Sequence, residues 1–135
     1  MKTVVILYGG DLTRHAFEKV FGGKSAAERV LDWAALFSER VVLCAKNGSP
    51  VSAELSSLCA ARSVQVVSKD FWSKAGFIAQ IASSLKEHAA ESAIVSYADT
   101  PFLNETLTRD LLDMHSKYAA EYSFADGFPY GLSPE

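Results

Sequence analysis

The chain contains little cysteine, no long apolar run and no block of like charge. Its 135 residues include two cysteines, Cys44 and Cys59, and neither stands in a Cys-x-x-Cys or Cys/His spacing typical of a metal site. We therefore interpret both as buried thiols of a protein from a reducing compartment, which favours the cytoplasm. No apolar run approaches the roughly 18 residues of a membrane span, and the run after Lys2 is too short for a signal peptide. These absences argue against a membrane partner.

Charge is nearly balanced along the chain. Thirteen Lys and Arg against 16 Asp and Glu give a formal net charge of −3, with no basic cluster in the sequence. This argues against nucleic acid as the main partner, because nucleic-acid-binding domains carry a basic stripe or face. A chain of 135 residues suffices for one core, so we predict a single domain over residues 1–135.

Apolar, β-branched segments alternate with segments of helical period. We expect strands at 3–8, 40–45, 64–67 and around 93–95, helices at 26–37, 51–62, 74–90 and from Asn104 onward, and a candidate fifth strand at 121–125. This alternation predicts an α/β fold, a three-layer, Rossmann-like, mostly parallel sheet flanked by helices. Phe71 and Trp72, in the connector before the third helix, are expected to pack in the core; the alternatives are that they cover a sheet edge or contact a ligand.

Two turns that follow expected strands contain the candidate site residues. Gly9-Gly10 comes directly after the first strand, where glycine lets backbone N–H groups approach a phosphate closely. Asp99 follows the strand around 93–95, and Pro101 biases Thr100 away from helical angles, so we expect Asp99 on a loop crest. Ligands of open α/β sheets bind at the carboxyl ends of strands. The alternative interpretations are a tight strand-to-helix turn for the glycines and a solvated turn residue for Asp99.

Several short segments resemble the nucleotidyltransferases of the GT-A-like fold, which include cytidylyltransferases of isoprenoid synthesis and guanylyltransferases of molybdenum-cofactor synthesis. Their opening pattern is Leu-Ala-Ala-Gly-x-Gly/Ser-x-Arg. In the segment from Leu7 to Arg14, Leu7, Gly10 and Arg14 match and Gly9 is close, whereas Tyr8 and Leu12 depart. Gly23-Lys24-Ser25 and residues 28–31 are similar to the family's Gly-Lys-Pro and Glu-Arg-Val-Leu, and residues 98–103 to its Asp-x-Pro-Phe-Leu.

The resemblance implies a nucleotide or nucleotide-sugar partner, Mg²⁺ as cofactor and nucleotidyl transfer as the reaction. It implies that Gly9 and Gly10 bind phosphates through their backbone, and that Arg14 and Lys24 are catalytic residues that offset phosphate charge. Asp99 would bind both the nucleotide and the metal. Leu12 stands where the family has a small residue beside the triphosphate. A second metal carboxylate would be Asp126 or a residue beyond Glu135.

A narrower resemblance concerns residues 115–131, which look like the N-terminal part of spirochaete spiro-SPASM proteins. In those proteins a nucleotidyltransferase-like domain precedes a radical-SAM domain and a Cys-rich domain. The ending Gly131-Leu-Ser-Pro-Glu135 also looks truncated, so we expect further domains C-terminal to this chain. Cys44 and Cys59 do not supply Cys-x3-Cys-x2-Cys, which predicts no iron–sulfur cluster in this fragment.

Two other functions remain open on sequence grounds. The chain could be a catalytically degenerate recognition or docking domain of a larger radical-SAM protein, which Leu12 and the missing second carboxylate favour. A flavodoxin-like or response-regulator domain fits less well. A response regulator needs acidic residues after its first strand, where this chain has Gly9-Gly10.

Overall fold

The structure is a computed structural model that describes residues 2–10, 12, 14–18, 23–48, 52–99 and 105–117. Strands and helices alternate in it as the sequence predicts. Their bounds are β1 Thr3–Gly9, the 3₁₀ helix η1 Arg14–Phe17, α1 Ala26–Ala35, β2 Val41–Lys46, α2 Ser52–Ala61, β3 Gln65–Lys69, α3 Lys74–Glu87, β4 Ser92–Tyr97 and α4 Glu105–Lys117. The candidate fifth strand at 121–125 lies outside the described residues. None of the described helices has the length and apolarity to cross a membrane.

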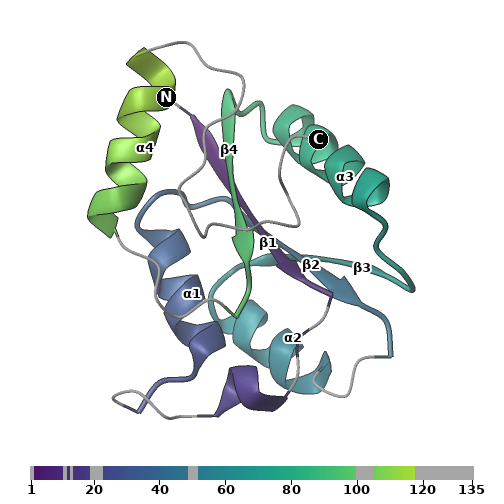
Figure 1. The fold of residues 1–135 in the computed structure, drawn as a ribbon. Coiled ribbons are helices and arrows are strands. Elements are labelled where there is room, and N and C mark those ends of the chain that lie inside the picture. Colours follow the sequence, from purple (N-terminus) through teal and green to yellow (C-terminus); the bar gives the residue numbers. More distant parts are fainter. Residues whose placement is uncertain are drawn as a thin grey trace.

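The four strands form one parallel sheet in the order β3-β2-β1-β4 (Figure 1). β1 lies in the interior of this sheet, and its residues Val4, Val5, Ile6 and Leu7 have no exposed surface. Strands covered on both faces read as continuous apolar runs, which explains why β1 and β2 lack the alternation of half-exposed strands. The predicted parallel α/β fold is therefore confirmed.

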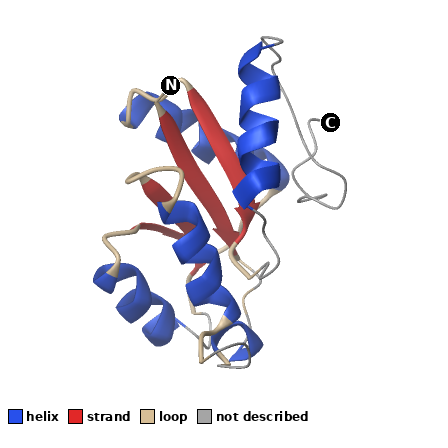
Figure 2. Ribbon diagram, turned by 90° about the vertical axis from the view of Figure 1, so that its left-hand side faces the viewer, coloured by secondary structure: helices blue, strands red, loops and turns tan. Residues whose placement is uncertain are grey.

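One face of the sheet is covered by η1, α1, α2 and α4. The larger core cluster joins Val5, Leu7 and Leu43 of the sheet to the apolar side of α1 and to Leu55 and Cys59 of α2. Helix α4 packs on the same cluster through Leu112, and Thr108 accepts a hydrogen bond from the indole of Trp33 at 3.3 Å. Figure 2 looks toward this side, with α1 and α4 in front of the strands.

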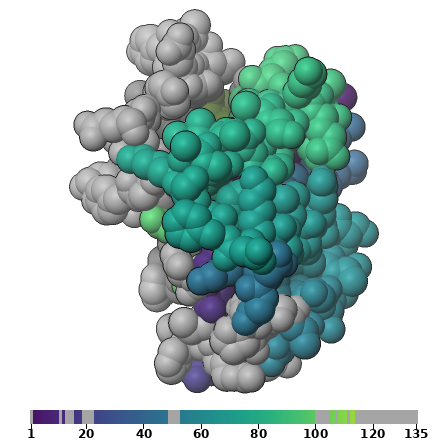
Figure 3. Space-filling model, turned by 90° about the vertical axis from the view of Figure 1, so that its right-hand side faces the viewer, coloured from purple at the N-terminus to yellow at the C-terminus, as the bar shows by residue number. Residues whose placement is uncertain are grey.

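The opposite face carries a smaller cluster built around α3. Val4, Ile6, Val42 and Cys44 of the sheet pack against Trp72 and Phe77. Figure 3 looks toward this side, where α3 and its connection from β3 make up much of the visible surface. Helices on both faces give the three layers that the sequence predicts.

Two aromatic neighbours before α3 have different environments. Trp72 is buried and donates its indole N–H to the carbonyl of Ala45 at 2.7 Å, as expected for a core residue. Phe71 is 74% exposed, so the prediction that it packs in the core is wrong. Chain direction explains the difference, because adjacent residues of an extended connector point to opposite sides.

Candidate functional site at the ends of β1 and β4

The first glycine turn and the Asp99 turn lie side by side at one edge of the sheet. β1 and β4 pair in register from Thr3 with Ser92 to Tyr8 with Tyr97. The ladder continues past the strands, because the N–H of Ala98 donates to the carbonyl of Tyr8 at 2.9 Å. This pairing brings the turn after Gly9 next to the turn that carries Asp99.

This edge is also where the direction of strand addition reverses. From β1 the chain adds β2 and β3 on one side of the sheet and then returns to place β4 on the other side of β1. Connections from neighbouring strands diverge at such a point and leave a crevice at the carboxyl ends, which is where open α/β sheets bind ligands. The topology therefore places a crevice between β1 and β4.

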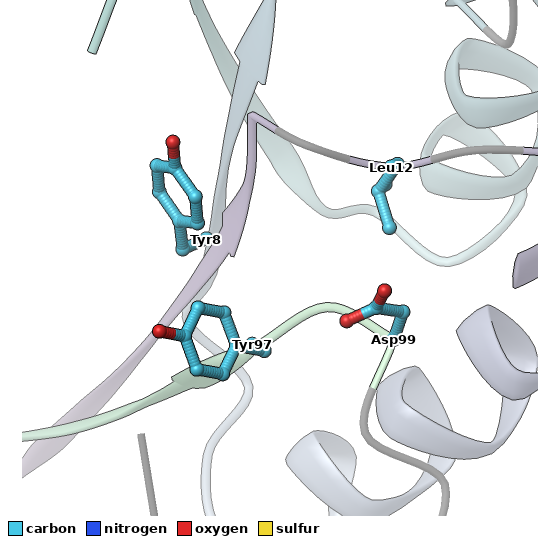
Figure 4. A pocket seen from close by; sticks show the side chains of 4 residues that line it. All are labelled: Tyr8, Leu12, Tyr97 and Asp99. Atoms are coloured by element: carbon cyan, nitrogen blue, oxygen red, sulfur yellow. The ribbon is translucent and has the colours of Figure 1, made fainter. Parts of the chain in front are cut away.

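A pocket of about 270 Å³ lies at this point, lined by Tyr8, Leu12, Tyr97 and Asp99. Figure 4 shows the carboxylate of Asp99 pointing into the space that Leu12 and the two tyrosines surround. Asp99 is exposed, as expected for a residue on a loop crest. Sequence reasoning identified Asp99 but not Tyr97. The only signal for Tyr97 was its place two residues before Asp99, on the same side of the strand end.

Gly9 and Gly10 are required by contacts within the protein. A β-carbon at Gly9 would lie 3.1 Å from Leu12 Cδ1 and 3.2 Å from Leu43 Cδ2. A β-carbon at Gly10 would lie 2.6 Å from the hydroxyl oxygen of Tyr8. Two residues that depart from the nucleotidyltransferase pattern, Tyr8 and Leu12, thus occupy the space beside the two glycines.

Leu12 is a core residue as well as a lining residue. It is 6% exposed and belongs to the cluster that joins η1 and α1 to the sheet. The missing side chain at Gly9 makes room for it, since the nearest Leu12 atom would be 3.1 Å from a β-carbon there. Most of the bulk of Leu12 is therefore packed into the protein, and its remaining surface faces the pocket.

Tyr8 is held by two aromatic rings. Its ring meets Phe77 edge-on at 5.3 Å and Tyr97 at 6.1 Å between centroids, with interplanar angles of 80° and 73°. Edge-to-face contacts of this kind favour a fixed ring orientation. The hydroxyl of Tyr8 is consequently kept over Gly10, which makes Tyr8 part of the pocket wall.

Lys24 has a defined environment that does not include the pocket lining. It precedes Ser25, the N-cap of α1, whose side chain accepts from the N–H of Glu28 while Glu28 bonds back to the N–H of Ser25. Its ammonium group lies 2.6 Å from a carboxylate oxygen of Asp32. Ser25 and Glu28 stand in the Ser-x-x-Glu spacing of a capping box, whereas no local spacing indicates that Asp32 is the partner of Lys24.

For the remaining candidate residues the structure describes only part of the chain. Arg14 begins η1, and its side chain is outside the described residues, as are Pro101 and Asp126. In the described parts of the chain, no group of three His, Cys, Asp or Glu side chains could hold a metal ion. Asp99 is thus the carboxylate that the described pocket offers to a cation.

The two cysteines lie in the core, as predicted. Burial raises the pKa of Cys44 to about 12 and that of Cys59 to about 11, and nearby Lys69 offsets this only in part for Cys44. Both thiols are therefore protonated at neutral pH, as is typical of structural buried cysteines.

The chain is similar to known proteins in sequence and in fold. An uncharacterized protein of Treponema pallidum (strain Nichols) is 41% identical over 61 residues, which cover 42% of this chain and 28% of that protein. A crystal structure of 4-diphosphocytidyl-2C-methyl-D-erythritol synthase superposes with a TM-score of 0.66 at 14% identity, over 87% of this chain and 56% of the other. A CMP:2-keto-3-deoxy-manno-octonic acid synthetase complexed with CTP gives 0.63 at 15% identity, over 89% and 49%.

At these identities the solved structures establish the fold, and this chain spans about half their length. The family described as MobA-like NTP transferase domain matches residues 4–129, nearly the whole chain. The match includes both turns of the site, Gly9-Gly10 and Asp99, and the candidate cation Lys24. The chain therefore belongs to the MobA-like NTP transferase domain family.

Proposed function

We propose that the pocket between β1 and β4 binds a nucleoside triphosphate or a nucleotide-sugar together with Mg²⁺, and that the domain transfers a nucleotidyl group. The observation that carries this proposal is the exposed carboxylate of Asp99 in a pocket at the strand-order reversal. Membership of the NTP transferase family supports it, as does the solved relative that holds CTP.

The donor set fits a magnesium ion that arrives with its substrate. Mg²⁺ prefers oxygen ligands and is commonly held by one or two carboxylates plus substrate phosphates and waters. Among the described residues that line the pocket, Asp99 is the one carboxylate, which suits an ion held mainly by substrate phosphates and waters. The ion would neutralise charge on the phosphates.

Each of the other site residues has a role in this proposal. The backbone of Gly9 and Gly10 would donate to phosphate oxygens, while Arg14 and Lys24 would offset charge that builds on the phosphates. A hydroxyl or phosphate oxygen of the acceptor would attack the α-phosphorus of the nucleotide. The bond between the α-phosphorus and the pyrophosphate oxygen would break, and the proton of an attacking hydroxyl would pass to solvent. Positioning and charge stabilisation suffice for such a step.

Calorimetric titration of CTP, GTP, UTP and ATP, each with and without Mg²⁺, tests the proposal. We expect one triphosphate to bind in a Mg²⁺-dependent manner and Asp99→Asn to weaken that binding at least tenfold, because it removes the only described pocket carboxylate. Asp113→Asn, an exposed carboxylate of α4, is the matched control and should bind like the parent. Binding of none of the four by the folded protein would reject the triphosphate site and with it the proposed nucleotidyl transfer.

A recognition domain without turnover is the second candidate. Leu12 and Tyr8 favour it, because they occupy space beside Gly9 and Gly10 that smaller residues would leave open. An assay of pyrophosphate release separates the two candidates. A recognition domain binds its nucleotide but releases no pyrophosphate over hours, whichever acceptor is added. The predicted link to a radical-SAM protein belongs with this candidate and stays a prediction.

A further inference from the structure

Lys24 is one of two cations attached to a single carboxylate. Its ammonium group lies 2.6 Å from Oδ2 of Asp32, on the second turn of α1. The guanidinium of Arg62, just after α2, hydrogen-bonds the other oxygen of the same carboxylate. The three charges form a small network that joins the start of α1 to the end of α2.

Lys24 lies at the same edge of the sheet as the pocket, whereas Arg62 follows the far end of α2. A helix that connects two parallel neighbouring strands starts at the carboxyl end of the first one and runs back across the sheet. α1 connects β1 to β2 (Figure 1). Its first turn, and with it Lys24, therefore belongs to the carboxyl edge that also carries Asp99 after β4. The backbone at Lys24 is fixed by Gly23, which has a φ of +79°, and by the capping box at Ser25.

The side chain of Lys24 can change partners, whereas Asp32 keeps one partner throughout. Lys24 is half-exposed, and its four-carbon side chain has several rotamers of similar energy. Departure of Lys24 leaves Asp32 bound to Arg62, so no carboxylate is left unpaired. Burial acts to raise the pKa of Asp32, but hydrogen bonds from Lys24 and Arg62 outweigh it and hold that pKa below its usual value.

The pocket itself needs a cation from outside its lining. Tyr8, Leu12, Tyr97 and Asp99 supply no positive charge among the described lining residues. A nucleotide phosphate placed beside Asp99 would therefore attract cations at this edge. Among the cations whose side chains the structure describes, Lys24 is half-exposed, directly precedes the N-cap of α1 and lies on Asp32.

We propose that Asp32 is a positioning residue that holds Lys24 and competes with nucleotide phosphates for its ammonium group. Arg62 remains on Asp32 when Lys24 turns to the ligand. This inference rests on the proposed nucleotide site. It names a residue that acts through Lys24 and does not itself touch the nucleotide.

Affinity for the nucleotide identified by the calorimetric screen tests the competition. Asp32→Asn frees Lys24 and should tighten binding about two- to fivefold, the range expected for breaking one exposed ion pair. Lys24→Ala should weaken binding, and the double variant should match Lys24→Ala alone. Glu105→Gln, which removes one carboxylate from the exposed pair with Arg109, controls for the change in net charge and should leave affinity unchanged.

Three results would overturn the inference while leaving the nucleotide site intact. They are weaker binding by Asp32→Asn, equal tightening by Asp32→Asn in the Lys24→Ala background, and equal tightening by Glu105→Gln. Thermal unfolding of each variant checks that the compared proteins are folded. A parent protein that binds none of the four triphosphates rejects the proposed function, and the inference falls with it.

Discussion

At the scale of single residues, Tyr8 and Gly10 form an interlocked pair at the pocket. A β-carbon at Gly10 would lie 2.6 Å from the Tyr8 hydroxyl oxygen and 2.8 Å from Cζ, and contacts with Phe77 and Tyr97 prevent the ring from turning away cheaply. We expect Gly10→Ala to lower the free energy of unfolding by about 1–3 kcal/mol, the usual cost of overpacking. In a Tyr8→Ala background the same substitution should cost much less.

Urea unfolding of the four proteins of this double-mutant cycle measures the coupling. Gly9→Ala is the matched control, since a β-carbon there would meet Leu12 and Leu43 instead of Tyr8. Its cost should be the same with and without Tyr8→Ala. Additive costs for Gly10→Ala and Tyr8→Ala would show that the ring does not confine Gly10.

Not all of this residue-level detail is readable from the sequence. Gly9, Gly10 and Asp99 could be singled out because glycine after a strand and aspartate before proline are local patterns. The contact between Tyr8 and Gly10 depends on the rotamer that Phe77 and Tyr97 impose, and those partners are distant in sequence. The pairing of Lys24 with Asp32 likewise spans eight residues and a helix start, beyond the spacing of ordinary helical pairs.

At the scale of secondary-structure elements, the start of α1 is the best-defined helix end. Ser25 is 1% exposed and takes part in a reciprocal capping box with Glu28. We expect Ser25→Ala to reduce the free energy of unfolding by about 1–2 kcal/mol, because a buried N–H of the first turn loses its partner. Denaturant unfolding followed by far-UV circular dichroism measures the change.

The N-cap of α3 provides the comparison. Ser73 accepts from the N–H of Gly76 at 2.9 Å but is exposed, so water can replace it. Ser73→Ala should therefore cost clearly less than Ser25→Ala, near 0.5 kcal/mol. Equal costs at the two positions would mean that burial of the cap and the reciprocal bond contribute nothing.

Element positions could be predicted well, and their surroundings less well. Continuous apolar runs located β1 and β2 within a residue or two, because strands covered on both faces leave little room for polar side chains. The apolar residues of α3 are only partly buried: Phe77 is in the core, whereas Ile78 is 49% exposed. Periodicity gives the face of a helix but not how much of that face the sheet covers.

At the scale of the whole molecule, the two thiols are probes for the unfolding of the two core clusters, one on each face of the sheet. Cys44 belongs to the cluster under α3 and Cys59 to the cluster under α1 and α2. Both should be inert to a thiol reagent in the folded protein and react together across the urea transition. Single-cysteine variants Cys44→Ala and Cys59→Ala, followed by thiol labelling, test this; separate midpoints would show that the two layers unfold independently.

Alkaline pH should weaken the fold through the same groups. An unfolded cysteine titrates near pH 8.5, whereas folding raises the pKa of Cys44 to about 12 and that of Cys59 to about 11. The stabilising contribution is complete below about pH 8.5 and is lost as the pH rises toward the folded values. Urea midpoints measured between pH 7 and 10 should fall, and less steeply in Cys44→Ala.

The interior place of β1 has a consequence for synthesis. Thr3 pairs with Ser92, and their hydroxyl oxygens lie 3.0 Å apart, so β1 has strand partners on both sides only after β4 has been synthesised. After β3 is made, the 28 residues from 70 to 97 must still be added, which takes roughly 1–6 s at ordinary elongation rates. During that interval one edge of the apolar run from Val4 to Leu7 lacks its β4 partner. The nascent chain therefore exposes an unpaired side of β1 that the folded sheet covers, and wrong strand pairing at β1 is expected during synthesis.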